Sequence, residues 1–332
     1  MAIIMANKTK VRDSNFELLR VLLIFMVLLG HANMWFLGSE YQTETEHCIR
    51  VFVEVVCLPA VNAFVLISGW FGIKGDYRRV FPIIFQLLMC TVPVAIVMNV
   101  MRQINLLNLD DIAEYVLGGN NYWFVIDYIG LVLFAPILNI IVHNVNKVVL
   151  RTFFIGVLAL IVPLDVVFRS SVLGVNGGYS LIWFIYLYLL ARYMRLYGIE
   201  WLDRSKWMVM VACIVLQTIL LYFNLIGNRY TNPLILLPAM SIILIFKEYS
   251  FKSNIVNYLA SGTLIVYMLH MHPCFYREIG VFLRNLYYSN GYYWYMIDVI
   301  GLIVLLYFVA VAVDKMQALI WRSISRLIFD NK

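Results

Sequence analysis

Long apolar runs separated by short polar stretches follow one another along the whole chain. A run of about 20 apolar residues crosses the roughly 30 Å hydrocarbon core of a bilayer as a helix. The pattern therefore predicts an all-α fold, a polytopic membrane helical bundle of about ten transmembrane helices. These lie near residues 16–37, 49–72, 80–101, 122–142, 150–168, 180–197, 206–226, 232–247, 254–276 and 293–314.

A single domain over residues 1–332 is expected, because no linker, repeat or low-complexity tract interrupts the pattern. The first run is expected to remain as a span rather than to be a cleaved signal peptide, since it is long and contains Arg20.

Composition supports a membrane protein, because 63% of the residues are hydrophobic and only 13% are charged. Soluble domains carry about 25% charged residues. The net charge of +6 comes from basic residues scattered singly and in pairs, so no basic stripe is present to bind nucleic acid. The five cysteines lack the CxxC spacing of metal or redox sites, so neither a disulfide framework nor a metal site is expected.

Lysine and arginine in the short loops predict the orientation. Eighteen of them fall on one side and six on the other, which places both termini in the cytoplasm, with residues 1–15 and 315–332 as cytoplasmic tails. The second tail is expected either to lie on the inner leaflet as an amphipathic helix or to extend the last span. The six on the outer side are Arg50, Arg102, Arg169, Arg229, Arg277 and Arg284.

The first predicted helix carries three ionisable residues at helical spacing. Arg20 and His31 are eleven residues apart, so they share one face at a separation of about 16 Å along the axis. Glu17, three residues before Arg20, joins that face and is expected to pair with it. Placing ionisable residues within a membrane costs free energy, so such residues indicate function. Arg20 and His31, which lie at different depths, are therefore expected to have different roles.

Further ionisable residues map to the outer half of the bilayer. Together they predict a polar cavity open to the outside, although Asp165, close to the end of a span, is better interpreted as a packing or interfacial group. The set comprises Glu54, Asp127, Asp165 and Asp298, with His31 and His270.

On the inner side, Ser68 and Gly69 end the second predicted helix ahead of a basic loop. Lys74 is interpreted as an orientation signal. Arg78 and Arg79 either serve the same purpose or hold a phosphate, because guanidinium groups match phosphate oxygens. Coenzyme A would suit Arg20 near the cytoplasmic boundary and His31 farther out in the bilayer. Its phosphates and its thioester lie at opposite ends of a long flexible arm.

Two segments resemble a known family. "ELLRVLLIFMVLLGH", with Glu17, Arg20 and His31, is similar to the first helix of the acyltransferase 3 membrane family. In that helix an arginine follows an acidic residue after two intervening positions, and a histidine follows the arginine after ten more. "NAFVLISGWF" resembles the family's phenylalanine-rich segment that ends in Ser-Gly-aromatic, here Ser68 and Gly69.

Two later segments extend the resemblance to most of the chain. "YWFVIDYIGLVLFAPIL" is similar to the family's Trp-Phe helix with a later proline, here Trp123, Phe124 and Pro136. "LIVYMLHMHP" resembles its late helix with a Tyr-x-x-His pattern, here Tyr267 and His270.

The resemblance implies transfer of an acyl group, most often acetyl from acetyl-CoA, to a carbohydrate or lipid-linked acceptor. Relatives often carry a third arginine in the first cytoplasmic loop, three positions after the Arg78–Arg79 pair. Pro82 occupies that position here, so the donor is expected either to be held more weakly or to be held with the help of Arg192 and Arg195.

The resulting hypothesis is a multi-pass O-acyltransferase of the cell membrane, which is expected to be a bacterial inner membrane. His31 acts as general base, its ordinary pKa near neutrality suiting the task; a covalent acyl-imidazole is the alternative. Acyl-CoA is the donor substrate, and no permanently bound cofactor is expected. The predicted residues are His31, Arg20 and Glu17 for catalysis, Arg20, Ser68, Arg78, Arg79, Arg192 and Arg195 for acyl-CoA, and Glu54, Trp123, Asp127, His270 and Asp298 for the acceptor.

Other interpretations remain open from the sequence. A secondary transporter or exporter would also use intramembrane carboxylates, but it predicts internal repeats and paired broken helices, which the sequence does not display. An amino-sugar N-acyltransferase and a ligand-sensing membrane subunit are two more. Ser68 is equally well explained by close helix packing beside Gly69. The acceptor, the acyl chain and the oligomeric state are left open.

Overall fold

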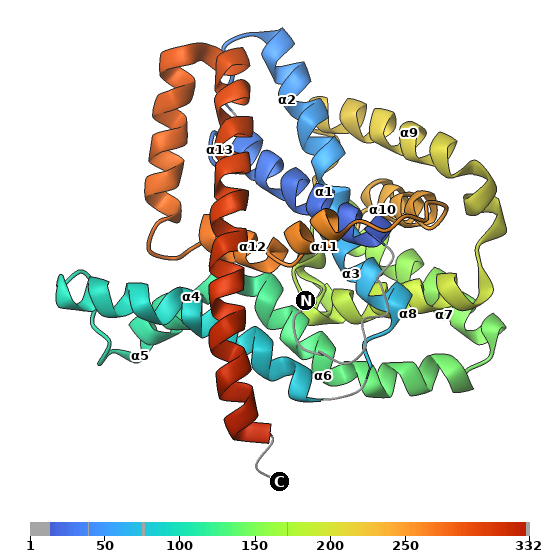
Figure 1. Ribbon diagram of the computed structural model, residues 1–332. Coiled ribbons are helices and arrows are strands. Elements are labelled where there is room, and N and C mark those ends of the chain that lie inside the picture. Colours follow the sequence, from blue (N-terminus) through green and yellow to red (C-terminus); the bar gives the residue numbers. More distant parts are fainter. Residues whose placement is uncertain (1–13, 39, 75–76, 171, 330–332) are drawn as a thin grey trace. The chain divides into compact units, whose positions relative to one another are not determined.

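The computed structural model describes residues 14–38, 40–74, 77–170 and 172–329, which are helical with connecting turns and contain no β-strand. The predicted all-α fold is confirmed (Figure 1). The chain forms two compact units, each built from non-consecutive segments. Unit one comprises residues 1–32, 78–123 and 250–332, and unit two comprises residues 33–77 and 124–249. The single domain expected from the sequence stays a prediction.

Unit one is arranged around the short helix α12 (Thr263–His270). This helix contacts α1 (Ser14–Gly30), α4 (Val80–Val100) and α13 (Tyr276–Phe329), and α1 also contacts α11 (Asn254–Ala260) (Figure 1). The side chain of Leu19 and that of Leu23 on α1 are buried in this packing. The shorter elements are η2 (Tyr77–Arg79), α5 (Leu109–Asp111), η3 (Ile112–Val116) and η4 (Gly119–Tyr122).

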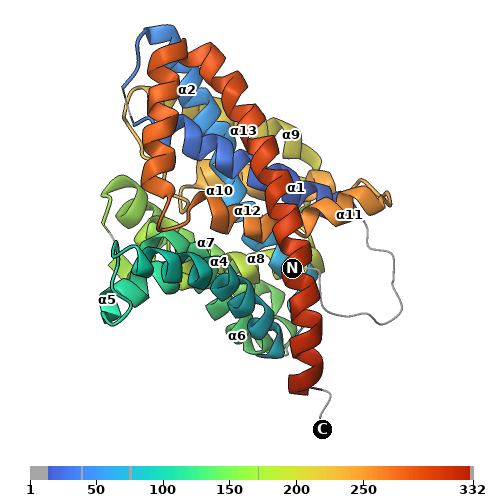
Figure 2. The same ribbon diagram turned by 60° about the vertical axis from the view of Figure 1, so that its left-hand side comes forward.

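Helix α13 bends sharply at Gly291, where the backbone adopts φ 71° and ψ 167°. Glycine adopts this positive φ without the steric cost that a Cβ atom brings. The helix therefore has two legs, residues 276–290 and 292–329, which meet at this bend (Figures 1 and 2).

The second leg of α13 continues without interruption through the predicted C-terminal tail to Phe329. The structure thus supports the tail as an extension of the last helix. Gln317, Ala318 and Trp321 are buried, and the Trp321 ring lies 5.0 Å from that of Phe85 on α4. Most of the other predicted tail, residues 1–13, lies outside the described residues.

Unit two contains the remaining long helices. Helix α3 packs closely on α8 and α10, and α9 packs on α10 and α2. The bounds are α2 (Glu44–Cys57), α3 (Pro59–Phe71), α6 (Trp123–Asn144), α7 (Lys147–Ile161), α8 (Leu181–Tyr197), α9 (Glu200–Tyr222) and α10 (Pro233–Phe246), with the short turns η5 (Val162–Val167), η6 (Val172–Gly174) and η7 (Asn176–Gly178).

Gly69 allows α3 and α8 to approach each other closely. A Cβ atom at this position would lie 2.5 Å from the backbone oxygen of Tyr188 and 2.7 Å from the Cβ of Ala191. These separations are far below van der Waals contact, so a larger residue would push the helices apart. The packing interpretation of the Ser68–Gly69 pair therefore has a structural basis.

Within the described residues, seven helical segments are long and apolar enough to cross a membrane. Three predicted spans are shorter than that. Residues 180–197 form α8 with 17 residues, 232–247 form α10 with 14 residues, and 254–276 divide into α11 and α12 at a turn. A multi-pass membrane protein follows from these segments, while the count of about ten and the cytoplasmic termini stay predictions.

Candidate functional site

Helix α1 presents the predicted Glu17–Arg20 pair. The Arg20 Nη1 atom lies 2.6 Å from Glu17 Oε1, and the Arg20 side chain is 26% exposed against 9% for Glu17. The spacing of three residues places both on one helical face, as the sequence predicts. Glu17 thus fixes a guanidinium that remains partly accessible, so Arg20 retains donors for a further anion.

His31 begins η1 (His31–Trp35), a π-helical turn that continues α1. Such turns widen the helix locally and are frequent at functional sites. The His31 Nδ1 atom lies 2.9 Å from Nε2 of His270. The two ring centroids are 5.1 Å apart, with an interplanar angle of 37°. A direct hydrogen bond therefore joins two histidines that are 239 residues apart in sequence.

His270 ends α12 and is buried. Its Nδ1 atom lies 3.1 Å from the backbone oxygen of Val266, one helical turn earlier. The ring of Tyr267 packs edge-on against it at 5.6 Å. Each nitrogen of His270 therefore has a defined partner, one on η1 and one on its own helix.

The turn that precedes α6 holds this end of α12 in place. The Tyr267 hydroxyl donates to the backbone oxygen of Asn121 over 2.8 Å. Asn121 Nδ2 donates to the oxygen of Met271, and the Tyr122 hydroxyl donates to that of Met268. These three bonds position the helix turn that carries His270.

A fourth bond holds the chain next to His31. The hydroxyl of Tyr295, a fully buried residue of α13, donates to the backbone oxygen of Ala32 over 2.7 Å. Helices α12 and α13 thus secure both sides of the histidine pair. The sequence analysis did not identify Tyr295 or Tyr122, because buried tyrosines on apolar helices look like ordinary core residues.

The remaining predicted residues of unit one lie at other places. Arg78, exposed, and Arg79, partly buried, form the short turn before α4. Trp123, partly buried, begins α6. Asp298 accepts a hydrogen bond from Asn290 Nδ2 over 2.9 Å. This bond connects the two legs of α13, so Asp298 has a structural partner, and its predicted contact with the acceptor stays a prediction.

Helices α3 and α8 of unit two bring together three of the predicted donor residues. The Ser68 hydroxyl lies 3.1 Å from that of Tyr128. Arg195 places its guanidinium carbon 5.0 Å from the centroid of the Trp70 ring, a cation–π contact. Arg192 Nη2 lies 3.3 Å from His143 Nε2. The same helix pair thus holds one hydroxyl and two guanidinium groups.

A small hydrogen-bond network fixes the backbone just beyond α3. The Tyr188 hydroxyl accepts from the Ile73 amide and donates to Asn139 Oδ1, both over 2.9 Å. Asn139 Nδ2 donates to the Ile73 oxygen over 2.9 Å. The basic loop therefore leaves α3 from a fixed position, an arrangement that the sequence analysis did not find.

Glu54 is buried on α2, near the side chains of Asn33, Asn228 and Arg50. Its Oε2 atom makes no hydrogen bond within the described part of the chain. Arg50, 1% exposed, donates to backbone oxygens of residues 33, 38 and 40. The sequence analysis took this arginine for a loop charge, whereas it lies on α2 and binds backbone oxygens within η1 and beyond its end.

Asp165 and Asp127 differ in their surroundings. Asp165 is fully buried, pairs with Arg229 at 2.7 Å and accepts from the Gly177 amide and the Thr231 hydroxyl. This geometry supports the interpretation of Asp165 as a packing group. Asp127 lies partly exposed on α6, and its predicted role with the acceptor stays a prediction.

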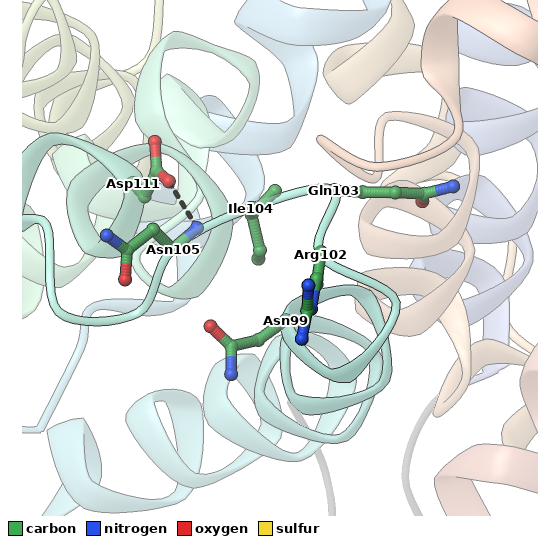
Figure 3. A pocket seen from close by; sticks show the side chains of 6 residues that line it. All are labelled: Asn99, Arg102, Gln103, Ile104, Asn105 and Asp111. Carbon is green, nitrogen blue, oxygen red and sulfur yellow. Dashed lines mark hydrogen bonds between the residues drawn. The ribbon is translucent and has the colours of Figure 1, made fainter.

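A polar pocket of about 440 Å³ lies beyond the end of α4, away in sequence from every predicted site residue (Figure 3). Across it, the Asn105 amide donates to Asp111 Oδ2 over 2.6 Å. No group of three or more His, Cys, Asp or Glu side chains suited to a metal occurs in the described ranges. The pocket is lined by Asn99, Arg102, Gln103, Ile104, Asn105 and Asp111.

Comparison with known families identifies the chain. A family model described as an acyltransferase domain, that of the acyltransferase 3 family, matches residues 13–314. The chain belongs to the acyltransferase 3 family. The matched region includes α1 with its Glu17–Arg20 pair, the histidine pair and segments of both units of this membrane acyltransferase. No curated protein and no solved structure matches the chain.

Membership in an acyltransferase family gives the histidine pair its chemical context. Acyl transfer to a hydroxyl requires a base to remove the hydroxyl proton, and histidine is the side chain that most often does so. In this acyltransferase, a hydrogen bond to His270 holds the His31 ring. The pair is therefore the candidate for the reacting centre.

Proposed function

We propose that this protein is a membrane-bound O-acyltransferase that moves an acyl group, acetyl in the first instance, from cytosolic acyl-CoA to a hydroxyl of a surface polysaccharide, oligosaccharide or lipid-linked glycan. The observation that carries the proposal is the hydrogen-bonded His31–His270 pair at the end of α1, in a chain of the acyltransferase 3 family.

In the proposed reaction, His31 takes the proton of the acceptor hydroxyl as its oxygen attacks the thioester carbonyl carbon. The new C–O bond forms and the C–S bond breaks, so the acyl group leaves CoA. The thiolate of CoA then receives the proton held by His31. The histidine returns to its neutral form at the end of each cycle, and the proton count balances.

The donor phosphates are assigned to cationic groups. Arg20, oriented by Glu17, is partly accessible, and Arg78 is exposed. Arg79, next to Arg78, is proposed to bind the same phosphates, while Arg192 and Arg195 of unit two stay predictions for the donor. Guanidinium groups suit this task because they bind phosphate oxygens through paired N–H donors. Ser68 is proposed to contact the CoA arm, and Glu54, Trp123, Asp127 and Asp298 the acceptor.

The proposal is tested with the purified protein in lipid nanodiscs and radiolabelled acetyl-CoA. We expect release of free CoA that depends on added glycan acceptor, with the label in an alkali-labile ester on the glycan. Mass spectrometry of surface glycans from cells with and without the gene then identifies the acceptor. Label in an amide would indicate an N-acyltransferase, and absence of both CoA release and labelled glycan would contradict the proposal.

A further inference from the structure

Resting on the proposed function, we propose that His270 is a positioning residue that holds His31 in the tautomer with its proton on Nδ1. His31 Nε2 then carries the lone pair that serves as the base. Sequence analysis assigned His270 to the acceptor. The contacts of its ring instead connect it to the base itself.

The direction of each hydrogen bond follows from the partners of His270. A neutral imidazole has one N–H donor and one lone-pair acceptor. The backbone oxygen of Val266 can only accept, so His270 Nδ1, 3.1 Å away, carries the proton. His270 Nε2 is then an acceptor. His31 Nδ1, 2.9 Å from it, must donate, which leaves the lone pair of His31 on Nε2.

The opposite assignment is unfavourable at both contacts. If His31 Nδ1 accepted from His270 Nε2, a neutral His270 would turn its Nδ1 lone pair toward the Val266 carbonyl at 3.1 Å. Two acceptors would then face each other. A doubly protonated His270 would avoid this conflict, but it would place a charge on a ring that is only 4% exposed. Burial of a charge without a paired anion is costly.

The surrounding bonds make this arrangement rigid. Val266 belongs to the same helix as His270, so the proton on His270 Nδ1 is set by local helix geometry. Tyr267 is itself tied to the Asn121 backbone, and Tyr295 holds the backbone at Ala32. Turning the His270 ring would break its bonds to Val266 and to His31. The base is therefore organised before substrate arrives.

Two substitutions at position 270 separate positioning from simple packing. His270→Gln can place an amide oxygen near the former Nε2 atom and keep an acceptor for His31 Nδ1. His270→Leu fills similar space but offers no acceptor. We expect kcat to stay within about fivefold for glutamine and to fall by at least about 30-fold for leucine, below the full 10²–10⁴ contribution of a general base. KM for acetyl-CoA is expected to remain unchanged in both.

His272 provides a matched control in the same segment. It is 1% exposed and its Nε2 atom lies 3.3 Å from the Cys90 oxygen, so its burial and polarity resemble those of His270. His272→Gln and His272→Leu are expected to give nearly equal kcat values. The ratio of kcat between the glutamine and leucine variants is therefore expected to be large at position 270 and near one at position 272. This contrast would show that the hydrogen-bond acceptor at position 270 matters.

The tautomer is measured directly by ¹⁵N NMR of the protein with labelled histidine in nanodiscs. Protonated and lone-pair nitrogens have well-separated shifts, and the signals of His31 among the five histidines are those lost in His31→Ala. We expect His31 to show protonated Nδ1 in the wild type and in His270→Gln, and a tautomer mixture in His270→Leu.

The outcomes distinguish this inference from the proposed function. Protonated Nε2 on wild-type His31, or equal kcat values for the two variants at position 270, would overturn the positioning role even if acyl transfer occurs. Full activity of His31→Ala would overturn the proposed base instead. If the leucine variant fails to fold, the wild-type and glutamine spectra still decide the tautomer.

Discussion

At the scale of single residues, the most specific prediction concerns the His31 imidazole. His31→Ala removes the proposed base and is expected to lower kcat by about 10² to 10⁴. Affinity for acetyl-CoA should be nearly unchanged, because the donor phosphates are assigned to other residues. Transfer rates and binding of acetyl-CoA, measured on the same purified preparation, check this. Near-normal turnover, or a loss explained by weaker donor binding alone, would exclude His31 as the base.

Arg20 is expected to show the opposite pattern. Arg20→Ala removes a phosphate contact and should weaken acetyl-CoA binding by roughly 10- to 150-fold, in line with a charged hydrogen bond of about 1.5–3 kcal/mol. The substitution also leaves the Glu17 carboxylate, 9% exposed, without its 2.6 Å partner. Isothermal titration with acetyl-CoA measures the binding loss.

A double variant controls for this orphaned carboxylate. Glu17→Gln combined with Arg20→Ala removes the unpaired charge, so folding stability should recover while donor binding stays weak. If donor binding also recovers in the double variant, Arg20 serves only to neutralise Glu17.

The candidate site was predictable from the sequence where contacts are local. The Glu17–Arg20 pair follows from a spacing of three residues on one helix. The bond between His31 and His270 joins residues 239 positions apart, and helical periodicity gives the face of a residue but not its partner on another helix. Arg50 shows the same limit, because its predicted place among the outer-loop charges did not reveal a helical residue that is only 1% exposed.

At the scale of helices, the contact between α3 and α8 depends on one missing side chain. Gly69→Ala would put a Cβ atom 2.5 Å from the Tyr188 backbone oxygen. Because backbone must move to make room, we expect a loss of about 1–3 kcal/mol in stability, and therefore a lower Tm. Weaker donor binding is also expected, since Arg192 and Arg195 lie on the displaced helix.

Gly156→Ala is the matched control for this helix contact. Gly156 lies within α7, and a Cβ atom there would meet no other atom within 4 Å. Alanine favours a helix interior by up to about 1 kcal/mol over glycine, so Tm should be unchanged or slightly higher. Equal effects of the two substitutions on Tm would show that the close approach at Gly69 is unimportant.

Helix boundaries were less predictable than helix existence. Apolar runs located most helices, yet the predicted span 254–276 is divided between α11 and α12. Here Ser261 donates to the buried Asp314 of α13 over 2.7 Å. Residues 276–290 form a helix before the Gly291 bend, although the sequence analysis placed Arg277 and Arg284 in a loop between two spans. Both differences come from tertiary contacts and one glycine, which hydropathy does not detect.

At the scale of the whole molecule, composition was sufficient to predict an all-helical membrane protein, whereas orientation remains testable only by experiment. The excess of lysine and arginine in alternate loops, eighteen against six, predicts which loops face the cytoplasm. Leu107, 93% exposed, lies in a predicted outer loop, and Ser250, also exposed, lies in a predicted inner loop. These two positions are suitable for labelling because their side chains are accessible.

Leu107→Cys should react with a membrane-impermeant thiol reagent in intact cells, and Ser250→Cys should react only after the cells are opened. The background protein should carry Cys48→Ser, because Cys48 is the exposed one among the free cysteines of the described chain. A permeant thiol reagent should label both positions in intact cells, which controls for accessibility. The expected pattern follows from the cost of moving clustered positive charge across the membrane during insertion.

Labelling of Ser250→Cys but not of Leu107→Cys in intact cells would invert the topology. Arg20 would then lie at the outer boundary, where cytosolic acyl-CoA could not reach it, and the assignment of donor and acceptor sides would have to be reversed.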